Sequence, residues 1–415
     1  MADAFYIHEM PNGMTLVGER MEHVSSAAMS ILAPCGAAHD PEGMEGATAV
    51  TAEWRLRGAG DRNSRQLTDA LDSLGCQHSH SVQGEYFQLG TAQLGRNLPA
   101  VLEILTDIVR RPTLAEETFE PCRQLVIQDL ISLEDEPAGK CRVLLREKFF
   151  PFPLGRCVYG REEALRNLGP GAARLQAQRS LAPAGTILGV AGNIDWDRFR
   201  QLAEKCFGDW RAEAPPPVRI REPEGGITHL KKDSAQVHIA LAHRSVTPSS
   251  PHYYPARLAE SVLSGGMSSR LFVEVRDKRG LAYHASTRYV TLRDHAGLFT
   301  YVGTPPDRAQ ETLAVTVREL RRLGEGIEEA EIVRSRTQLK SSLIMQGESV
   351  VARAGAIVSD WYHLGRVRTL EELSAAIDRV TIPEVLEYLR LYPAERFSGL
   401  IIGPEPLDAK AAGAV

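Results

Sequence analysis

Residues 264–283 read SGGMSSRLFVEVRDKRGLAY, and this stretch carries the most specific local pattern in the chain. The spacing predicts a helix over about 268–278, because apolar side chains recur on one face at Leu271, Phe272 and Val275. Gly280 can end that helix in the left-handed conformation, and a strand then starts at Tyr283. Arg276 lies in the last helical turn. We therefore expect a helix–glycine–strand corner that brings Arg276 and Tyr283 to one surface.

A break in composition divides the chain upstream of this corner. Residues 211–226 read RAEAPPPVRIREPEGG, and three consecutive prolines exclude a helix and favour an extended linker. The expected organisation is an N-terminal domain over 1–212, a linker over 213–226 and a C-terminal domain over 227–415.

The two halves predict the same order of elements: a strand, two helices, a strand pair, further helices and a closing strand. In the first half, a hairpin is expected within 15–36, because its two strands alternate roughly between apolar and polar residues. The predicted fold class is α+β, occurring twice, each time as a mainly antiparallel sheet with helices packed on one face.

The remaining predicted elements follow the hydrophobic periodicity. Helices are expected at about 46–58, 64–74, 97–110, 115–135, 138–148, 195–210, 251–262, 307–323, 327–346, 349–362, 369–379 and 382–391. Strands are expected at about 76–82, 85–93, 186–192, 235–245, 281–290, 296–303 and 397–403.

Composition places this chain of 415 residues among ordinary soluble proteins. Hydrophobic residues make up 43%, charged residues 24%, and the net charge of −5 gives no electrostatic reason to expect nucleic acid or an anionic membrane as a partner. No stretch approaches the ~18 apolar residues of a membrane span, and no signal peptide is visible. Six cysteines without a Cys-x-x-Cys pair favour reduced, structural thiols, so a cytoplasmic location is expected.

Several motifs together resemble the M16 metallopeptidases, the family of pitrilysin and the mitochondrial processing peptidase. The pieces that carry this resemblance are SSRLF followed by VRDKRGLAY, PNGMTLV near the start, RQLVIQDLISLEDEP at 123–137, and TILGVAGNIDWDRFRQLAEKCFGDW at 186–210. The resemblance covers essentially the whole chain. It implies two related α+β domains that form half of a clamshell.

The resemblance gives meaning to residues 46–58, GATAVTAEWRLRG. Active family members carry His-x-x-Glu-His here: the two histidines bind zinc and the glutamate activates a water molecule. This chain is identified as an inactive member, because Ala49 stands at the first histidine, Ala52 at the general base and Glu53 at the second histidine. Asp129 stands at the distal acid. Two carboxylates without an imidazole make a poor zinc site, so we expect no metal in this chain and leave residual binding at Glu53 and Asp129 open.

The other histidines offer no clear substitute. His78 and His80 share one face of a predicted strand, and exposed histidines on a sheet surface are favoured about four to one over a metal site. The same strand, 76–82, is a candidate sheet edge, and in this family a peptide adds to an edge strand of the catalytic half.

Arg276 and Tyr283 match an arginine and a tyrosine that reach the zinc site from the opposite half in active family members. The resemblance implies that they bind the scissile carbonyl and the oxyanion in trans. Without the resemblance, a helix C-cap for Arg276 and a packed strand aromatic for Tyr283 are favoured about two to one.

These observations predict the non-catalytic subunit of a heterodimeric M16-type zinc peptidase that hydrolyses unfolded peptides. The expected partner is a subunit with His-x-x-Glu-His that holds the zinc. Two alternatives stay open. The chain could be a catalytically silent structural or peptide-binding homodimer, or a subunit of a protease dedicated to maturing one precursor peptide.

Overall fold

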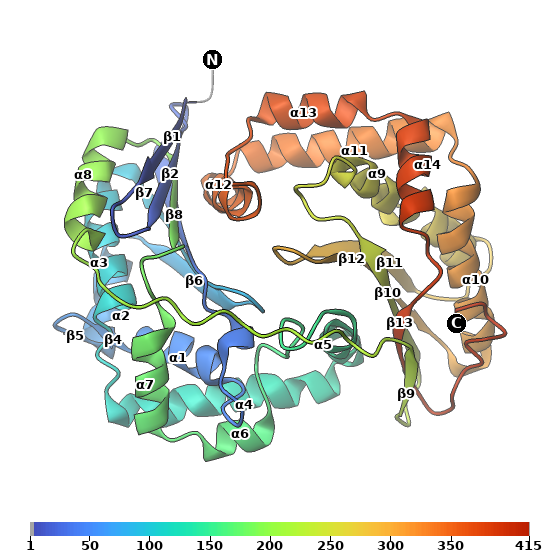
Figure 1. Cartoon of the computed structure of the whole chain (residues 1–415), viewed down its shortest axis with the longest axis horizontal. Helices are drawn as coiled ribbons and strands as arrows, with labels where there is room; N and C mark the ends of the chain where they lie inside the picture. Colours follow the sequence, from blue (N-terminus) through green and yellow to red (C-terminus); the bar gives the residue numbers. More distant parts are fainter. Residues whose placement is uncertain (1–3, 415) are drawn as a thin grey trace. The chain divides into compact units, whose positions relative to one another are not determined.

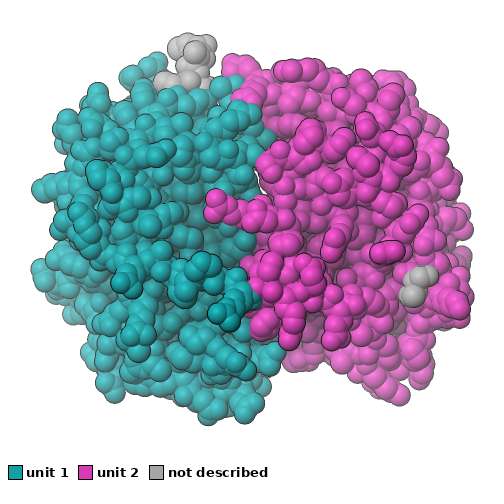
Figure 2. Space-filling view, viewed as in Figure 1, with its two compact units in different colours: residues 1–132, 156–219, 345–369 teal, residues 133–155, 220–344, 370–415 magenta. Residues whose placement is uncertain are grey.

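The computed structural model describes residues 4–414 (Figure 1). It divides into two compact units (Figure 2). Unit 1 consists of Met1–Ser132, Arg156–Arg219 and Met345–Thr369, and unit 2 consists of Leu133–Gly155, Ile220–Ile344 and Leu370–Val415.

Unit 1 is built on a six-stranded sheet with the order β1-β2-β8-β3-β7-β6. These strands are β1 Ala4–Glu9, β2 Thr15–Arg20, β3 Ser26–Ala33, β6 Gln77–Val82, β7 Phe87–Leu94 and β8 Ile187–Gly192. All neighbouring strands run antiparallel except β2 and β8. A short ladder joins β4 Gly58–Ala59 to β5 Arg62–Asn63.

The helices of unit 1 cover mainly one face of this sheet. They are α1 Ala47–Arg55, α2 Ser64–Ser73, α3 Leu98–Arg110, α4 Phe119–Asp135, α6 Glu162–Asn167, α7 Pro170–Ser180, α8 Trp196–Phe207 and α12 Val350–Leu364; the last three residues of α4 belong to unit 2. The main core lies between the sheet and α2, α3 and α8, where side chains such as Ile31, Leu89 and Leu102 are fully buried.

One helix, α12, lies on the opposite face of the same sheet. Ile357 and Val358 pack on Val17 and Leu32. A Cβ on Gly189 would lie 2.3 Å from Val358 Cγ2, so only glycine allows this close approach.

A buried ion pair fixes α12 in position. Arg353 Nε donates to both carboxylate oxygens of Glu19 at 2.9 and 2.8 Å, and both side chains are 3% exposed. Removing either charge of such a buried pair is expected to destabilise the fold, because the remaining charge would lose its ion-pair partner.

Unit 2 repeats this plan with five strands in the order β11-β12-β10-β13-β9. Its strands are β9 Ile227–Lys231, β10 Val237–Ser245, β11 His284–Thr291, β12 Ala296–Thr304 and β13 Ser398–Gly403. The parallel pair β9 and β13 corresponds to β2 and β8, and the antiparallel pairs correspond in the same order. The pattern of strand pairing is thus the same in both units, as a tandem repeat predicts.

The helices of unit 2 also cover mainly one face of its sheet. They are α5 Pro137–Phe149, α9 Tyr253–Ser264, α10 Ala309–Arg322, α11 Glu329–Gly347, α13 Leu370–Arg379 and α14 Ile382–Leu391, with a π-helix over Phe272–Asp277 and the last three residues of α11 in unit 1. The other face is covered by α5, whose Cys141 and Leu145 pack on Ala240 and Ala242.

The predicted fold class is confirmed, with one addition: a single helix covers the second face of each sheet. In both cases that helix comes from a remote part of the chain, α12 in unit 1 and α5 in unit 2. The division near residue 219 lies inside the expected 213–226 linker. The expected domain bounds differ from the units at two segments: residues 345–369, with α12, belong to unit 1, and residues 133–155, with α5, belong to unit 2.

One predicted pairing is wrong. The hairpin expected within 15–36 does not form, because β8 lies between β2 and β3 and pairs with both. Strand β2 instead forms its hairpin with β1, across the Pro-Asn-Gly turn.

Candidate functional site

The segment in which the resemblance places the incomplete metal motif forms a well-anchored helix, α1. At the start of α1, Asp40 accepts hydrogen bonds from the backbone N–H groups of Gly46 and Thr48, both at 2.8 Å. At its end, Trp54 Nε1 donates to the carbonyl of Ala115 at 3.0 Å, and the buried guanidinium of Arg55 donates to the carbonyl of Val109. Helix α1 is thus ordered, although it lacks the histidines and the glutamate of the metal motif.

Two of the motif positions are small and buried. Ala49 is 9% exposed and Ala52 is 3% exposed, so each presents a methyl group to the surrounding core. A methyl group neither binds a metal nor accepts a proton. No general base therefore stands at position 52.

The third motif position, Glu53, is already engaged. Its Oε1 lies 3.0 Å from Nε2 of His80 on β6, and each side chain is 20% exposed. The hydrogen bond from His80 lowers the pKa of Glu53 below its ordinary 4.5, although burial opposes this shift. The carboxylate is thus held in its charged form by the edge strand.

His80 was not predicted to take part in this site. The sequence favours exposed histidines at 78 and 80, and in the structure His78 is exposed, but His80 is partly buried against Glu53. Sequence spacing could not indicate this contact, because it joins residues from two elements.

Asp129, at the distal acid position, is half-buried on α4. Burial raises its pKa, and the negative charge of Glu53 adds to the increase. The two carboxylates therefore influence each other. Across residues 4–414, however, no group of three or more His, Cys, Asp or Glu side chains is arranged to hold a metal ion. This donor set does not fit zinc, which prefers nitrogen and sulfur ligands.

The second candidate site lies in unit 2, at the corner formed by residues 264–283. Arg276 is exposed and Tyr283 is 80% exposed. The centre of the Arg276 guanidinium lies 4.7 Å from the centroid of the Tyr283 ring, within cation–π range. The structure thus brings the two predicted residues together on one surface. Neither side chain is buried in the core. The alternative in which Tyr283 is a packed aromatic of a strand therefore does not describe its position.

The backbone of this corner explains the juxtaposition. A π-helix spans Phe272–Asp277, and the N–H groups of Gly280 and Leu281 donate to the carbonyls of Arg276 and Val275 at 3.0 and 2.9 Å. Gly280 has φ +58°, the left-handed conformation predicted for it. The chain therefore turns back at once, and Tyr283 comes to lie beside the turn that carries Arg276.

A local ion-pair cluster holds the corner in shape. Glu274 is buried and forms ion pairs with Lys278 at 2.7 Å and with Arg279. Hydrogen bonds from Lys278 and Arg279 lower the pKa of Glu274 to about 2. Arg270 makes a two-pronged contact with Glu331, with both N···O distances at 2.7 Å.

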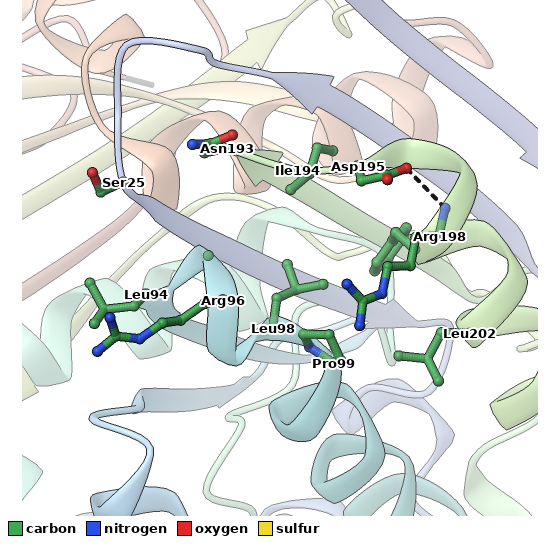
Figure 3. A pocket seen from close by; sticks show the side chains of 12 residues that line it. Ser25, Leu94, Arg96, Leu98, Pro99, Asn193, Ile194, Asp195, Arg198 and Leu202 are labelled. Carbon is green, nitrogen blue, oxygen red and sulfur yellow. Dashed lines mark hydrogen bonds between the residues drawn. The ribbon is translucent and has the colours of Figure 1, made fainter.

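A groove in unit 1 shares no residue with either candidate site (Figure 3). This groove of about 420 Å³ has an apolar floor that includes Leu98 and Pro99, which lie between the side chains of Arg96 and Arg198. The carboxylate of Asp195 is engaged in capping α8. Both arginines are exposed, so no buried polar group selects a ligand there.

Two family models match the chain. Residues 15–160 match the model described as Insulinase (Peptidase family M16), and residues 178–339 match the one described as Peptidase M16 inactive domain. An uncharacterized zinc protease from Rickettsia bellii is 25% identical to this chain, over 98% of it and 100% of the relative. Another from Bacillus subtilis is 26% identical over 95% of this chain and 97% of the relative.

Solved structures show the same fold. A protease from Helicobacter pylori matches with a TM-score of 0.89 at 18% identity, covering 97% of this chain and 100% of its own. A peptidase M16 inactive domain from Pseudomonas fluorescens matches with a TM-score of 0.90 at 14% identity, covering 98% and 99%. Among the described residues, no helix combines the length and apolar character needed to cross a membrane.

Proposed function

The chain belongs to peptidase family M16, and from this membership we propose that it is the non-catalytic subunit of a heterodimeric zinc peptidase. The observation that carries the proposal is the contrast between its two sites. Alanines and an occupied carboxylate stand where the metal motif belongs, whereas Arg276 and Tyr283 are exposed and stacked on each other.

The proposed partner is an M16 subunit with His-x-x-Glu-His, which holds the zinc and its water. This chain completes the chamber around an unfolded peptide. Arg276 then donates N–H groups to the scissile carbonyl, and Tyr283 donates its phenolic O–H to the oxygen on which negative charge develops. Such donors are most effective when they are oriented beforehand and water is excluded. Arginine suits the first role, because its planar fork is always charged.

Cytoplasmic assembly is part of the same proposal. The six cysteines, all within residues 4–414, form no disulfide with one another, which supports a reducing compartment.

A second candidate function is a catalytically silent homodimer that binds peptides. It is supported by β6, which is an outer strand of its sheet and has backbone groups available on one side. In that case, peptides bind to the homodimer and are not cleaved, even when an M16 protein with His-x-x-Glu-His is added.

Reconstitution separates the two candidates. The chain is purified alone, the His-x-x-Glu-His protein encoded in the same genome is purified alone, and both are mixed before cleavage of a pool of unfolded peptides is measured. We expect the chain alone to be inert and without stoichiometric zinc, and the mixture to cleave. Cleavage by this chain alone, or equal activity of the partner without it, would overturn the heterodimer proposal.

A further inference from the structure

The guanidinium of Arg276 lies within cation–π range of two aromatic rings. Its centre is 4.8 Å from the centroid of Phe272 and 4.7 Å from that of Tyr283. Such contacts use the π-face of each ring and consume none of the five N–H donors of the guanidinium.

Arg276 differs from the other two arginines of the corner. Arg270 is paired with Glu331, and Arg279 is paired with Glu274. Within residues 4–414, no hydrogen bond or ion pair engages the guanidinium of Arg276. The corner therefore neutralises two of its arginines and presents the third, held only by rings, to an incoming anion or polarised carbonyl.

Helical spacing accounts for the position of Phe272. Phe272 and Arg276 are four residues apart on the helical segment Phe272–Asp277, so their side chains meet on the same side of the turn. In this segment the N–H of Lys278 donates to the carbonyl of Val273, five residues earlier, which widens the turn. Phe272 is half-buried, so its ring is less free than a fully exposed one.

We propose that Phe272 is a positioning residue, which orients Arg276 before any substrate binds. This inference rests on the proposed function, since it assigns to Arg276 the role of binding the carbonyl oxygen. A long arginine side chain loses conformational freedom when it binds a ligand. The stack of Phe272, Arg276 and Tyr283 limits that freedom in the free protein, so less is lost in the transition state.

The first test compares Phe272→Leu with Phe272→Tyr in the reconstituted complex. Leucine keeps an apolar group at this half-buried position but removes the ring face, and we expect kcat to fall about tenfold with KM little changed. Tyrosine restores the ring, and with it the rate. Assembly with the partner is measured in parallel and is expected to be unchanged.

The second test needs neither partner nor activity. Order parameters of the arginine Nε–H groups are measured by NMR on the full chain. We expect Arg276 to be more ordered than Arg288, an exposed arginine on β11, and Phe272→Leu to lower the order of Arg276 towards that of Arg288. An unchanged order parameter in Phe272→Leu would overturn the inference.

The two proposals fail in different ways. If Arg276→Ala lowers turnover and Phe272→Leu leaves it unchanged, the positioning role of Phe272 is wrong and the proposed function stands. If Arg276→Ala leaves turnover unchanged, the proposed function is wrong, and the catalytic purpose of the stack is wrong with it.

Discussion

Helix α1 and the 264–283 corner are both ordered, helix-based segments, but they differ in the side chains that they present. Helix α1 is anchored by Asp40 at its start and Trp54 at its end, and it carries buried alanines where the resemblance implies a metal ligand and a general base. The corner exposes Arg276 and Tyr283 beside a cluster of ion pairs. The comparison teaches that an ordered helix can serve packing alone while side chains capable of chemistry are exposed elsewhere. The role of that exposed pair is therefore the point to test.

The largest expected effect comes from restoring the chemistry of α1. The variant Ala49→His, Ala52→Glu, Glu53→His, Asp129→Glu recreates two imidazoles on one helical face with a distal carboxylate. We expect zinc affinity at least about 10³-fold above that of the unchanged chain, or about 4 kcal/mol. The measurement is titration with a competing chelator, with circular dichroism to verify folding.

The matched control for this variant retains Ala49 and therefore lacks one imidazole. Its zinc affinity is expected to remain weak. Equal affinity in the control, or no gain in a folded full variant, would show that residues 49, 52, 53 and 129 do not occupy the metal-binding positions.

The next effect tests the corner. In the reconstituted complex, Arg276→Ala and Tyr283→Phe each remove one donor to developing charge, which typically costs about 10²–10³ in kcat. Steady-state kinetics on one peptide measures this loss. Arg288→Ala, at another exposed arginine, is the control and leaves kcat unchanged. A normal kcat in both corner variants would remove the corner from catalysis.

A smaller effect concerns the ion pairs that shape the corner. Glu274→Gln keeps the size of the side chain and removes its charge, and we expect a loss of about 1–3 kcal/mol in the free energy of unfolding at pH 7. The folded pKa of about 2 lies below the ordinary 4.5, so this stabilisation is present above pH 4.5 and is lost as pH falls towards 2. Urea unfolding of both proteins at several pH values measures the difference. A gap of the same size at low pH would mean that charge is not the cause.

The smallest effect concerns the contact between Glu53 and His80. Glu53→Gln weakens the contact with His80, and we expect a loss of about 0.5–1 kcal/mol in the free energy of unfolding at pH 7. Because the pKa of Glu53 is lowered, this contribution is present above its ordinary 4.5 and declines as the pH falls below it. The exposed pair Arg65 and Asp69 provides the control, since Asp69→Asn is expected to change stability by less. A larger loss in the control would contradict the account of the Glu53 pair.

Local periodicity predicts most of the helices and strands, and tertiary contacts account for what it misses. Apolar spacing places α3, α10 and α14 within one or two residues of their bounds. Helix α6 and strand β9 are missed, because short segments carry few periods, and α7 is missed, because Leu175 is its one large apolar side chain. Strand β8 is predicted, but its insertion between β2 and β3 is not, because a run such as ILGVAG carries no information about its neighbours.

The resemblance to M16 is confirmed. The motif positions that it implies at residues 49, 52, 53 and 129 stay a prediction. The contact of His80 with Glu53 joins two elements and could not be predicted from spacing. Phe272 was assigned to the apolar face of its helix. Its spacing of four residues from Arg276 is the signal that could have indicated the stack.

Photo-crosslinking tests the central claim most directly, namely that this chain presents its corner to a peptide held by another subunit. Tyr283 is replaced by p-benzoylphenylalanine, and the complex is formed with a partner whose catalytic glutamate is changed to glutamine, so that the peptide binds without being cleaved. A second complex carries the same group at Leu391, an exposed position on α14. The account predicts crosslinks from position 283 to the peptide or to the partner's zinc-binding helix, and none to either from position 391. Crosslinks from position 283 that reach only this chain, or equal labelling from both positions, would contradict it.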